Sequence, residues 1–282
     1  MAFLLALASS VLYGSADFMG GFASRRASVV AVTALSQAVG LALLALALPL
    51  LPGAPRGADL AWGLGAGLSG SLGVVLLYRA LALGTVSTVA PLISLIAIAV
   101  PVGAGLAAGE RPGIAPLAGI VAGAVAVVLI GRAPEASHAA PGSTRRVLPI
   151  ALASGVLVGV FLVCIGRIAR GSGLLPLVVS RGTGTLLFAL LAAARRSPLR
   201  PAAAQWRLAL GCGAADVAAN LLYLLATQRG ALSLVATLVS LAPASTVVLA
   251  QLVLRERLAR IQQAGVALAL LALALLAQGT LR

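Results

Sequence analysis

The sequence predicts an all-α integral membrane protein, with ten transmembrane helices arranged as two inverted five-helix repeats. Three observations support this prediction: an apolar composition, ten apolar stretches of membrane-spanning length, and a sequence repeat between the two halves. Hydrophobic residues form 61% of the 282 residues and charged residues only 9%, whereas about a quarter of a typical soluble domain is charged. We therefore expect a multi-pass protein of the cell (inner) membrane.

Each of the ten apolar stretches has about 20 residues, the length that crosses roughly 30 Å of hydrocarbon as an α-helix. Between them lie segments rich in Arg, Pro and Gly, such as ASRRAS after the first stretch and GERPG after the fourth, which are typical of turns and loops. The stretches are residues 3–22, 28–51, 60–82, 86–107, 113–131, 148–168, 173–193, 206–228, 231–254 and 258–280.

A polar linker at residues 132–147 separates two halves with related sequences. The segment ALASSVLYG at residues 6–14 returns as ALASGVLVG at residues 151–159. Further along, GTVSTVAPLISL at residues 84–95 aligns with GALSLVATLVSL at residues 230–241. Two matches in the same order and at nearly the same spacing indicate an internal repeat.

The odd number of spans in each repeat predicts how the repeats are oriented. Five crossings leave the chain on the opposite side of the membrane, so residues 148–282 enter it upside down relative to residues 1–131. In folds with inverted repeats the substrate site lies near the midplane between the halves, and rocking of the halves exposes it to either side alternately. The arrangement therefore favours a secondary active transporter that works by alternating access.

The chain resembles the EamA-type branch of the drug/metabolite transporter superfamily over essentially its whole length. The motif LYGSADF at residues 12–18 is similar to the family's first-helix signature, with Tyr13 in place of the usual tryptophan. Pro243, followed thirteen residues later by a Glu-Arg pair, resembles the family's ninth helix, whereas the first repeat has Ala97 where that proline is expected. The resemblance implies two five-helix repeats and transport of a small organic solute or metabolite.

Three ionisable residues lie deep inside the predicted spans: Asp17 in the first, Arg181 in the seventh and Asp216 in the eighth. A charge at the bilayer centre costs at least about 2.5–3.5 kcal/mol, so such residues are candidates for a functional site. If Arg181 pairs with one aspartate, the other is left unpaired, and burial favours its neutral form. We expect the three residues to converge on a central cavity and to support proton-coupled efflux; a structural ion pair is the alternative.

Polar residues accompany these charges at helical spacing. Asn220 and Tyr223 follow Asp216 along one face of the eighth span, and Tyr13 shares a face of the first span with Asp17. We predict that these residues contact the solute or the coupling proton. Hydroxyl residues and a proline in the fourth and ninth spans are candidates for lining the cavity, with hydrogen bonds between helices as their alternative role. These candidates are Ser87, Pro91, Ser94, Ser233, Thr237 and Ser240.

Other classes of function fit the sequence less well. The 20 basic residues are spread between apolar stretches and not interleaved with aromatic residues, so no nucleic-acid partner is expected. A serine hydrolase inside the membrane would need a deep histidine, but His138 is in the linker, so we expect no enzyme. Two alternatives stay open: a flippase of the same fold for a lipid-linked substrate, and a non-transporting membrane partner protein.

The expected partners are a small-molecule solute, membrane lipids, and protons as the coupling ion. We expect the chain to act as a monomer, without a cofactor and without a metal ion.

Overall fold

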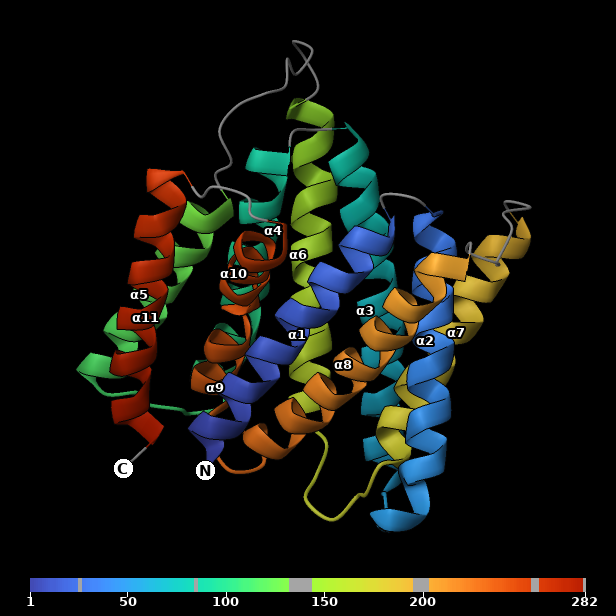
Figure 1. The fold of residues 1–282 in the computed structure, drawn as a ribbon. Helices are drawn as coiled ribbons and strands as arrows, with labels where there is room; N and C mark the ends of the chain where they lie inside the picture. Colours follow the sequence, from blue (N-terminus) through green and yellow to red (C-terminus); the bar gives the residue numbers. More distant parts are fainter. Residues whose placement is uncertain (25–26, 84–85, 132–143, 195–202, 255–258, 281–282) are drawn as a thin grey trace.

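The computed structural model describes residues 1–24, 27–83, 86–131, 144–194, 203–254 and 259–280, and these fold into helices joined by short loops (Figure 1). The first half forms α1 (Ala2–Ser24), α2 (Val29–Ala47), η1 (Leu48–Leu50), α3 (Gly57–Leu83), α4 (Val86–Ala107) and α5 (Ile114–Gly131). The second half forms α6 (Thr144–Gly166), α7 (Leu175–Ala194), α8 (Ala203–Thr227), α9 (Leu232–Val239), α10 (Ala242–Leu254) and α11 (Arg260–Thr280).

Within the described residues, eight helices are long and apolar enough to cross a membrane. Shorter apolar helices at Leu92–Ala107 and Leu232–Thr246 belong to the fourth and ninth predicted spans. The chain is therefore a multi-pass membrane protein, as its sequence predicts. The total of ten spans stays a prediction.

The ninth predicted span, residues 231–254, is interrupted and forms α9 and α10. Ser240 ends α9, where its N–H donates to Ala236 O at 2.9 Å. Pro243 stands in the first turn of α10, where the missing N–H of a proline does no harm because no helical partner is due there. The break is therefore located where a proline favours the start of a new helix over continuation of the old one.

Contacts between a helix of the first half and a helix of the second half have equivalents in which the two halves change places. Ser9 Oγ of α1 donates to Ala219 O of α8 at 2.8 Å, and Ser154 Oγ of α6 donates to Gly73 O of α3 at 2.9 Å. Ser154 follows Ser9 by 145 residues and Ala219 follows Gly73 by 146, which are the offsets of the sequence repeat. The packing of α1 on α8 thus has its counterpart in the packing of α6 on α3.

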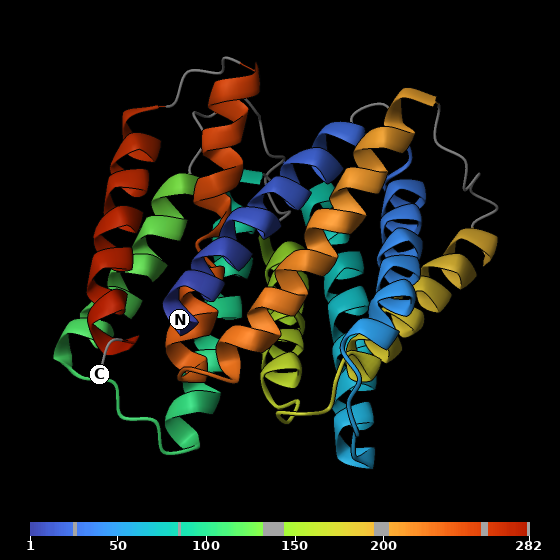
Figure 2. The same ribbon diagram turned by 60° about the horizontal axis from the view of Figure 1, so that its bottom comes forward.

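The same pairing relates α5 and α11, which pack together at one edge of the molecule (Figure 2). A Cβ on Gly119 of α5 would lie 2.9 Å from Leu276 Cγ, and a Cβ on Gly265 of α11 would lie 2.8 Å from Ile130 N. Gly119 and Gly265 are also 146 residues apart. Small residues at both positions let the two backbones approach closely, as is common between helices in membranes.

Equivalent helices of the two halves run in opposite directions. In Figure 1, α1 leads away from the end of the molecule that carries both termini, whereas α6 leads toward that end. Helices α5 and α11 are antiparallel in the same way. This is the relation expected between inverted repeats.

Labelling with a membrane-impermeant thiol reagent tests the inversion. Ile114, at the start of α5, is 91% exposed, and its repeat equivalent Arg260, at the start of α11, is exposed as well. With Cys164 and Cys212 replaced by alanine, we expect Ile114→Cys to be labelled from one face of the membrane and Arg260→Cys from the other face.

A third variant provides the control for this experiment. Leu50 of η1 is 78% exposed and lies at the same end of the molecule as Ile114 (Figure 1), so Leu50→Cys should react from the same face as Ile114→Cys. Labelling of positions 114 and 260 from one common face would contradict the inverted arrangement.

Candidate functional site

Two contacts set the register of α1 against α8. The Ser9 hydroxyl bonds the backbone of α8 near one end of the contact, and a Cβ on Gly20 would lie 3.2 Å from Cys212 Sγ at the other end. Asp17 lies between these contacts on α1, and Asp216 lies between them on α8. The two carboxylates, one from each repeat, are therefore near enough to interact electrostatically.

Arg181 of α7 forms an ion pair with Asp216, between Nη2 and Oδ2. The Arg181 side chain is 11% exposed and the Asp216 side chain 26%. A second guanidinium nitrogen, Nη1, donates a hydrogen bond to Gln37 Oε1 of α2. The guanidinium thus joins α7 to α8 and to α2, with two acceptors opposite its charge.

Glycines make room for this group of side chains. A Cβ on Gly40 of α2 would lie 2.6 Å from Val217 Cγ2 of α8 and in ordinary contact, at 3.5 Å, with Arg181 Cδ, so this glycine lets α2 approach α8 beside the ion pair. On α7, a Cβ on Gly184 would lie 2.7 Å from Gln37 Nε2 and 2.9 Å from Ser71 Oγ of α3. A bulkier side chain at Gly184 would displace these two polar groups.

Gln37 and Ser71 are members of the site that the sequence did not predict, because neither side chain is ionisable. A single amide in the otherwise apolar stretch 28–51 is a signal that could have identified Gln37. Ser71 is one of many small polar residues in the spans, so its position in the sequence does not distinguish it. Its hydroxyl is buried and has no hydrogen-bond partner within the described part of the chain.

Asp17 differs from Asp216 in its surroundings. Asp17 is exposed, and within the residues that the structure describes it has no ion-pair or hydrogen-bond partner. Tyr13 precedes it by one helical turn on α1. The Tyr13 hydroxyl is buried, also lacks a partner among the described residues, and interacts electrostatically with Asp216 and Arg181.

The other two predicted contacts on α8 have different environments. Asn220 Nδ2 donates to the backbone O of Asp216 at 2.6 Å and lies 3.4 Å from Asp216 Oδ1, so its amide adjoins the ion pair. Tyr223 is fully buried, and its hydroxyl donates to Leu162 O of α6 at 3.0 Å. The Tyr223 ring is thus held in the packing between α8 and α6, and its contact with a solute stays a prediction.

The candidates for cavity lining belong to α4 and to α9 with its C-cap. Ser233 and Thr237 are fully buried, and Thr237 Oγ1 donates to Ser233 O at 2.7 Å. Ser240 caps the end of α9, and Ser94 of α4 is half-buried. The side chains of the remaining two candidates lie outside the described part: Ser87 and Pro91. A central cavity lined by these residues stays a prediction.

At the end of the molecule that carries both termini, two loops join the repeats. Asp59, at the start of α3, accepts a hydrogen bond across the repeat boundary from Ala169 N at 2.9 Å. Gly53 and Gly173 approach so closely that a Cβ on either would overlap the backbone of the other. Gly173 has φ +63°, a conformation that glycine adopts without strain. We call residues 53–59 and 169–173 together the loop clasp.

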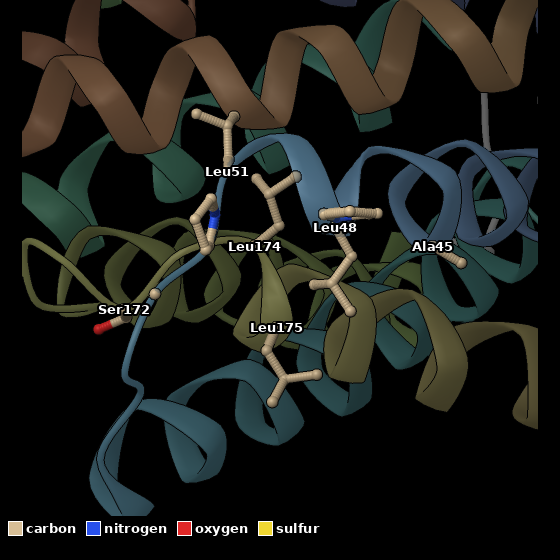
Figure 3. Close-up of a pocket in the computed structure, with 9 residues that line it drawn as sticks. Ala45, Leu48, Leu51, Ser172, Leu174 and Leu175 are labelled. Atoms are coloured by element: carbon tan, nitrogen blue, oxygen red, sulfur yellow. The ribbon is translucent and has the colours of Figure 1, made fainter.

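A pocket of about 430 Å³ lies beside the loop clasp, and Figure 3 shows its lining. Its walls come from the end of α2 with η1 and from the start of α7, and Ser172 contributes a hydroxyl group among otherwise apolar side chains. None of the predicted site residues lines this pocket. The ion pair and the pocket are thus separate features.

Comparison with known proteins identifies the family and the fold. Residues 1–132 and 146–278 match the model of the EamA-like transporter family. No curated protein matches the chain. A solved crystal structure, described simply as that of a protein, superposes with a TM-score of 0.79 and 20% identity, covering 97% of this chain and 95% of the other. At this identity the likeness shows the fold alone.

Removing one partner of the ion pair is expected to destabilise the protein, by an amount that depends on which partner is lost. Asp216→Leu leaves a guanidinium that keeps its charge, whereas Arg181→Met leaves carboxyl groups that can take up a proton. We expect Asp216→Leu to lower the free energy of unfolding by about 3 kcal/mol, near the lower end of what breaking a buried pair costs. Arg181→Met should cost less, and less at pH 6 than at pH 8.

Thermal unfolding in detergent at the two pH values measures these effects. The double variant Arg181→Met/Asp216→Leu should be more stable than Asp216→Leu alone, because it leaves no charge of the pair behind. Equal, pH-independent losses for both single variants, with additive loss in the double variant, would show that the pair is not coupled.

Proposed function

This chain belongs to the EamA-like transporter family, and on that premise we propose that it moves a small organic solute across the membrane by proton-coupled alternating access. The observation that carries the proposal is the group formed by Arg181, Asp216 and Asp17, to which both repeats contribute. Charges kept inside a membrane despite their cost are typically part of a substrate or ion path.

In this proposal Asp17 carries the coupling proton. Arg181 and Asp216 balance each other's charge, which leaves Asp17 as the carboxylate that can gain or lose a proton. The Asp17 side chain is exposed in the structure, as is required of a group that exchanges a proton. With two carboxylates and one guanidinium, proton uptake changes the charge of the group from −1 to 0.

Alternating access requires an end that closes, and the loop clasp is suited to that role. Its contacts join the two repeats, and a second contact supports it: Glu110, before α5, accepts hydrogen bonds from Leu232 N at 2.6 Å and Ser233 N at 2.9 Å at the start of α9. A carboxylate is stabilised at a helix N-terminus by the helix dipole. We infer that the end carrying the termini is closed in this conformation.

The opposite end differs at the position equivalent to Asp59. Gln205 stands 146 residues after Asp59. Its Oε1 is buried and accepts no hydrogen bond from the residues that the structure describes. The hydrogen bond that Asp59 accepts from the other repeat thus has no counterpart at Gln205 among the described residues. This difference supports the proposal that the end near Gln205 is the end that opens.

The proposed direction is efflux across the inner membrane, driven by protons that enter as the solute leaves, with each monomer acting alone. A flippase for a lipid-linked substrate is the second candidate, favoured by an apolar groove of about 410 Å³ between α4 and α5. No charged residue lines that groove. Because it leaves the deep charges without a role, we place solute transport first.

Hydrogen exchange tests the role of the loop clasp. Asp59→Ala removes the acceptor of Ala169 N, so we expect at least tenfold faster amide exchange in the peptide spanning residues 167–173. Ser15→Ala is the control, because the Ser15 hydroxyl bonds Val11 O within its own helix. Unchanged exchange in Asp59→Ala would contradict a clasp that depends on this carboxylate.

Transport into vesicles tests the coupling. Purified protein in vesicles is supplied with amino acids, nucleosides, sugars and organic cations, with and without a pH gradient. We expect the gradient to accelerate transport of one of these classes at least tenfold in the wild type and in Ser15→Ala. The variant Asp17→Asn should still fold and insert into the vesicle membrane, but the pH gradient should no longer accelerate its transport. Full acceleration in Asp17→Asn would exclude Asp17 as the coupling group.

A further inference from the structure

We propose that the solute of this site is an organic ammonium ion, which takes the place of the proton on Asp17. The inference rests on the proposed function and adds the chemical class of the solute. Its basis is the juxtaposition of an exposed, unpartnered carboxylate with a guanidinium that already has two acceptors.

The charges around Asp17 leave the site one unit negative. Asp17 and Asp216 contribute two negative charges and Arg181 one positive charge. The helices packed against α1 are α2, α8, α9, α10 and α11. The described parts of α2, α9 and α10 contain no ionisable side chain, whereas α8 also has the exposed Arg207 and the buried Tyr223, and α11 begins with the exposed Arg260. The other titratable groups near Asp17 are Tyr13 on α1 itself and, on α8, Cys212. Phenol and thiol groups are neutral near pH 7. A cation is therefore the solute charge that balances the site.

An anionic or zwitterionic solute is disfavoured by the contacts of Arg181. Two of its three guanidinium nitrogens, Nη2 and Nη1, are engaged by Asp216 Oδ2 and Gln37 Oε1. A carboxylate of the solute would compete with these acceptors, and displacing Asp216 would leave a partly buried carboxylate without its partner. A neutral solute brings no charge that could replace the proton on Asp17, so it would not be exchanged for that proton.

Tyr13 provides two features that suit an ammonium group. It lies four residues before Asp17, so both side chains lie on the same face of α1. Its aromatic ring can attract a cation by the interaction of positive charge with the ring face. Its hydroxyl oxygen is buried and has no partner within the described chain, so it can accept a hydrogen bond from an N–H of the solute once a rearrangement of the side chain exposes it.

The exchange balances in charge and atoms. Protonated Asp17 releases its proton as the ammonium ion binds, and the product is an ion pair between the carboxylate and the solute. One proton leaves for each cation that binds, and no covalent bond to the solute forms or breaks. The site thus holds either a proton or a cation, and its net charge is zero in both states.

Proton release from the purified protein tests the proposal without vesicles. Five probes share one phenylethyl skeleton: 2-phenylethylammonium, trimethyl(2-phenylethyl)ammonium, phenylalanine, 3-phenylpropionate and 2-phenylethanol. They are added to protein in weakly buffered detergent containing a pH-sensitive dye. We expect up to one proton per protein to be released by the two cations and none by the anion or the alcohol. Phenylalanine should bind at least tenfold more weakly than 2-phenylethylammonium.

Two variants make the result specific to Asp17. Asp17→Asn should abolish proton release and weaken binding of the quaternary cation, followed by calorimetry, at least tenfold. Ser15→Ala, two residues away on the same helix, should behave as the wild type. Proton release by cations that persists in Asp17→Asn would overturn the assignment.

The outcomes separate this inference from the proposed function. The assignment of an organic cation as the solute is overturned if neither cation binds, or if 3-phenylpropionate or 2-phenylethanol binds more tightly than the cations. The proposed pH-driven transport of another solute would still stand in that case. Cation binding with proton release, but without movement of the same cation in vesicles, supports the cation site and overturns transport.

Discussion

The constraint on which the structure depends most is the free-energy cost of placing the Arg181 guanidinium inside a membrane. Arg181 cannot lower this cost by losing its charge, so its surroundings must supply acceptors. Asp216 supplies a countercharge from α8 and Gln37 supplies an amide oxygen from α2. Because these acceptors come from two helices, the pairing fixes α7 against both. Gly184 leaves space for the side chains of Gln37 and Ser71, and Gly40 lets α2 approach Val217 of α8 closely.

A symmetric scaffold holds an asymmetric site. The backbone contacts of the halves repeat at offsets of 145 or 146 residues, as in the hydrogen bonds of Ser9 and Ser154. The charges do not repeat: Gly70 stands at the position equivalent to Asp216, and Leu162 at the position equivalent to Asp17. In the proposed mechanism, the symmetry supplies two related ends for alternate opening, and the single set of charges supplies one site for both ends.

Much of this fold was predictable because membrane spanning requires long apolar helices and because the repeat is written in the sequence. A pair of Arg181 with one aspartate was one of two interpretations of the deep charges, since charges in spans need partners. Which aspartate would pair was not predictable, because it depends on the register of α1 and α7 against α8. The contact of Tyr223 with α6 and the role of Gln37 depend on the same three-dimensional register.

The central claim is that Asp17 exchanges a proton while Asp216 stays ionised beside Arg181. Infrared difference spectroscopy of the protonated carboxyl C=O band, recorded between low and high pH, tests this most directly. The account predicts a pH-dependent band that is lost in Asp17→Asn and retained in Asp216→Asn. A band that persists in Asp17→Asn and disappears in Asp216→Asn would contradict it.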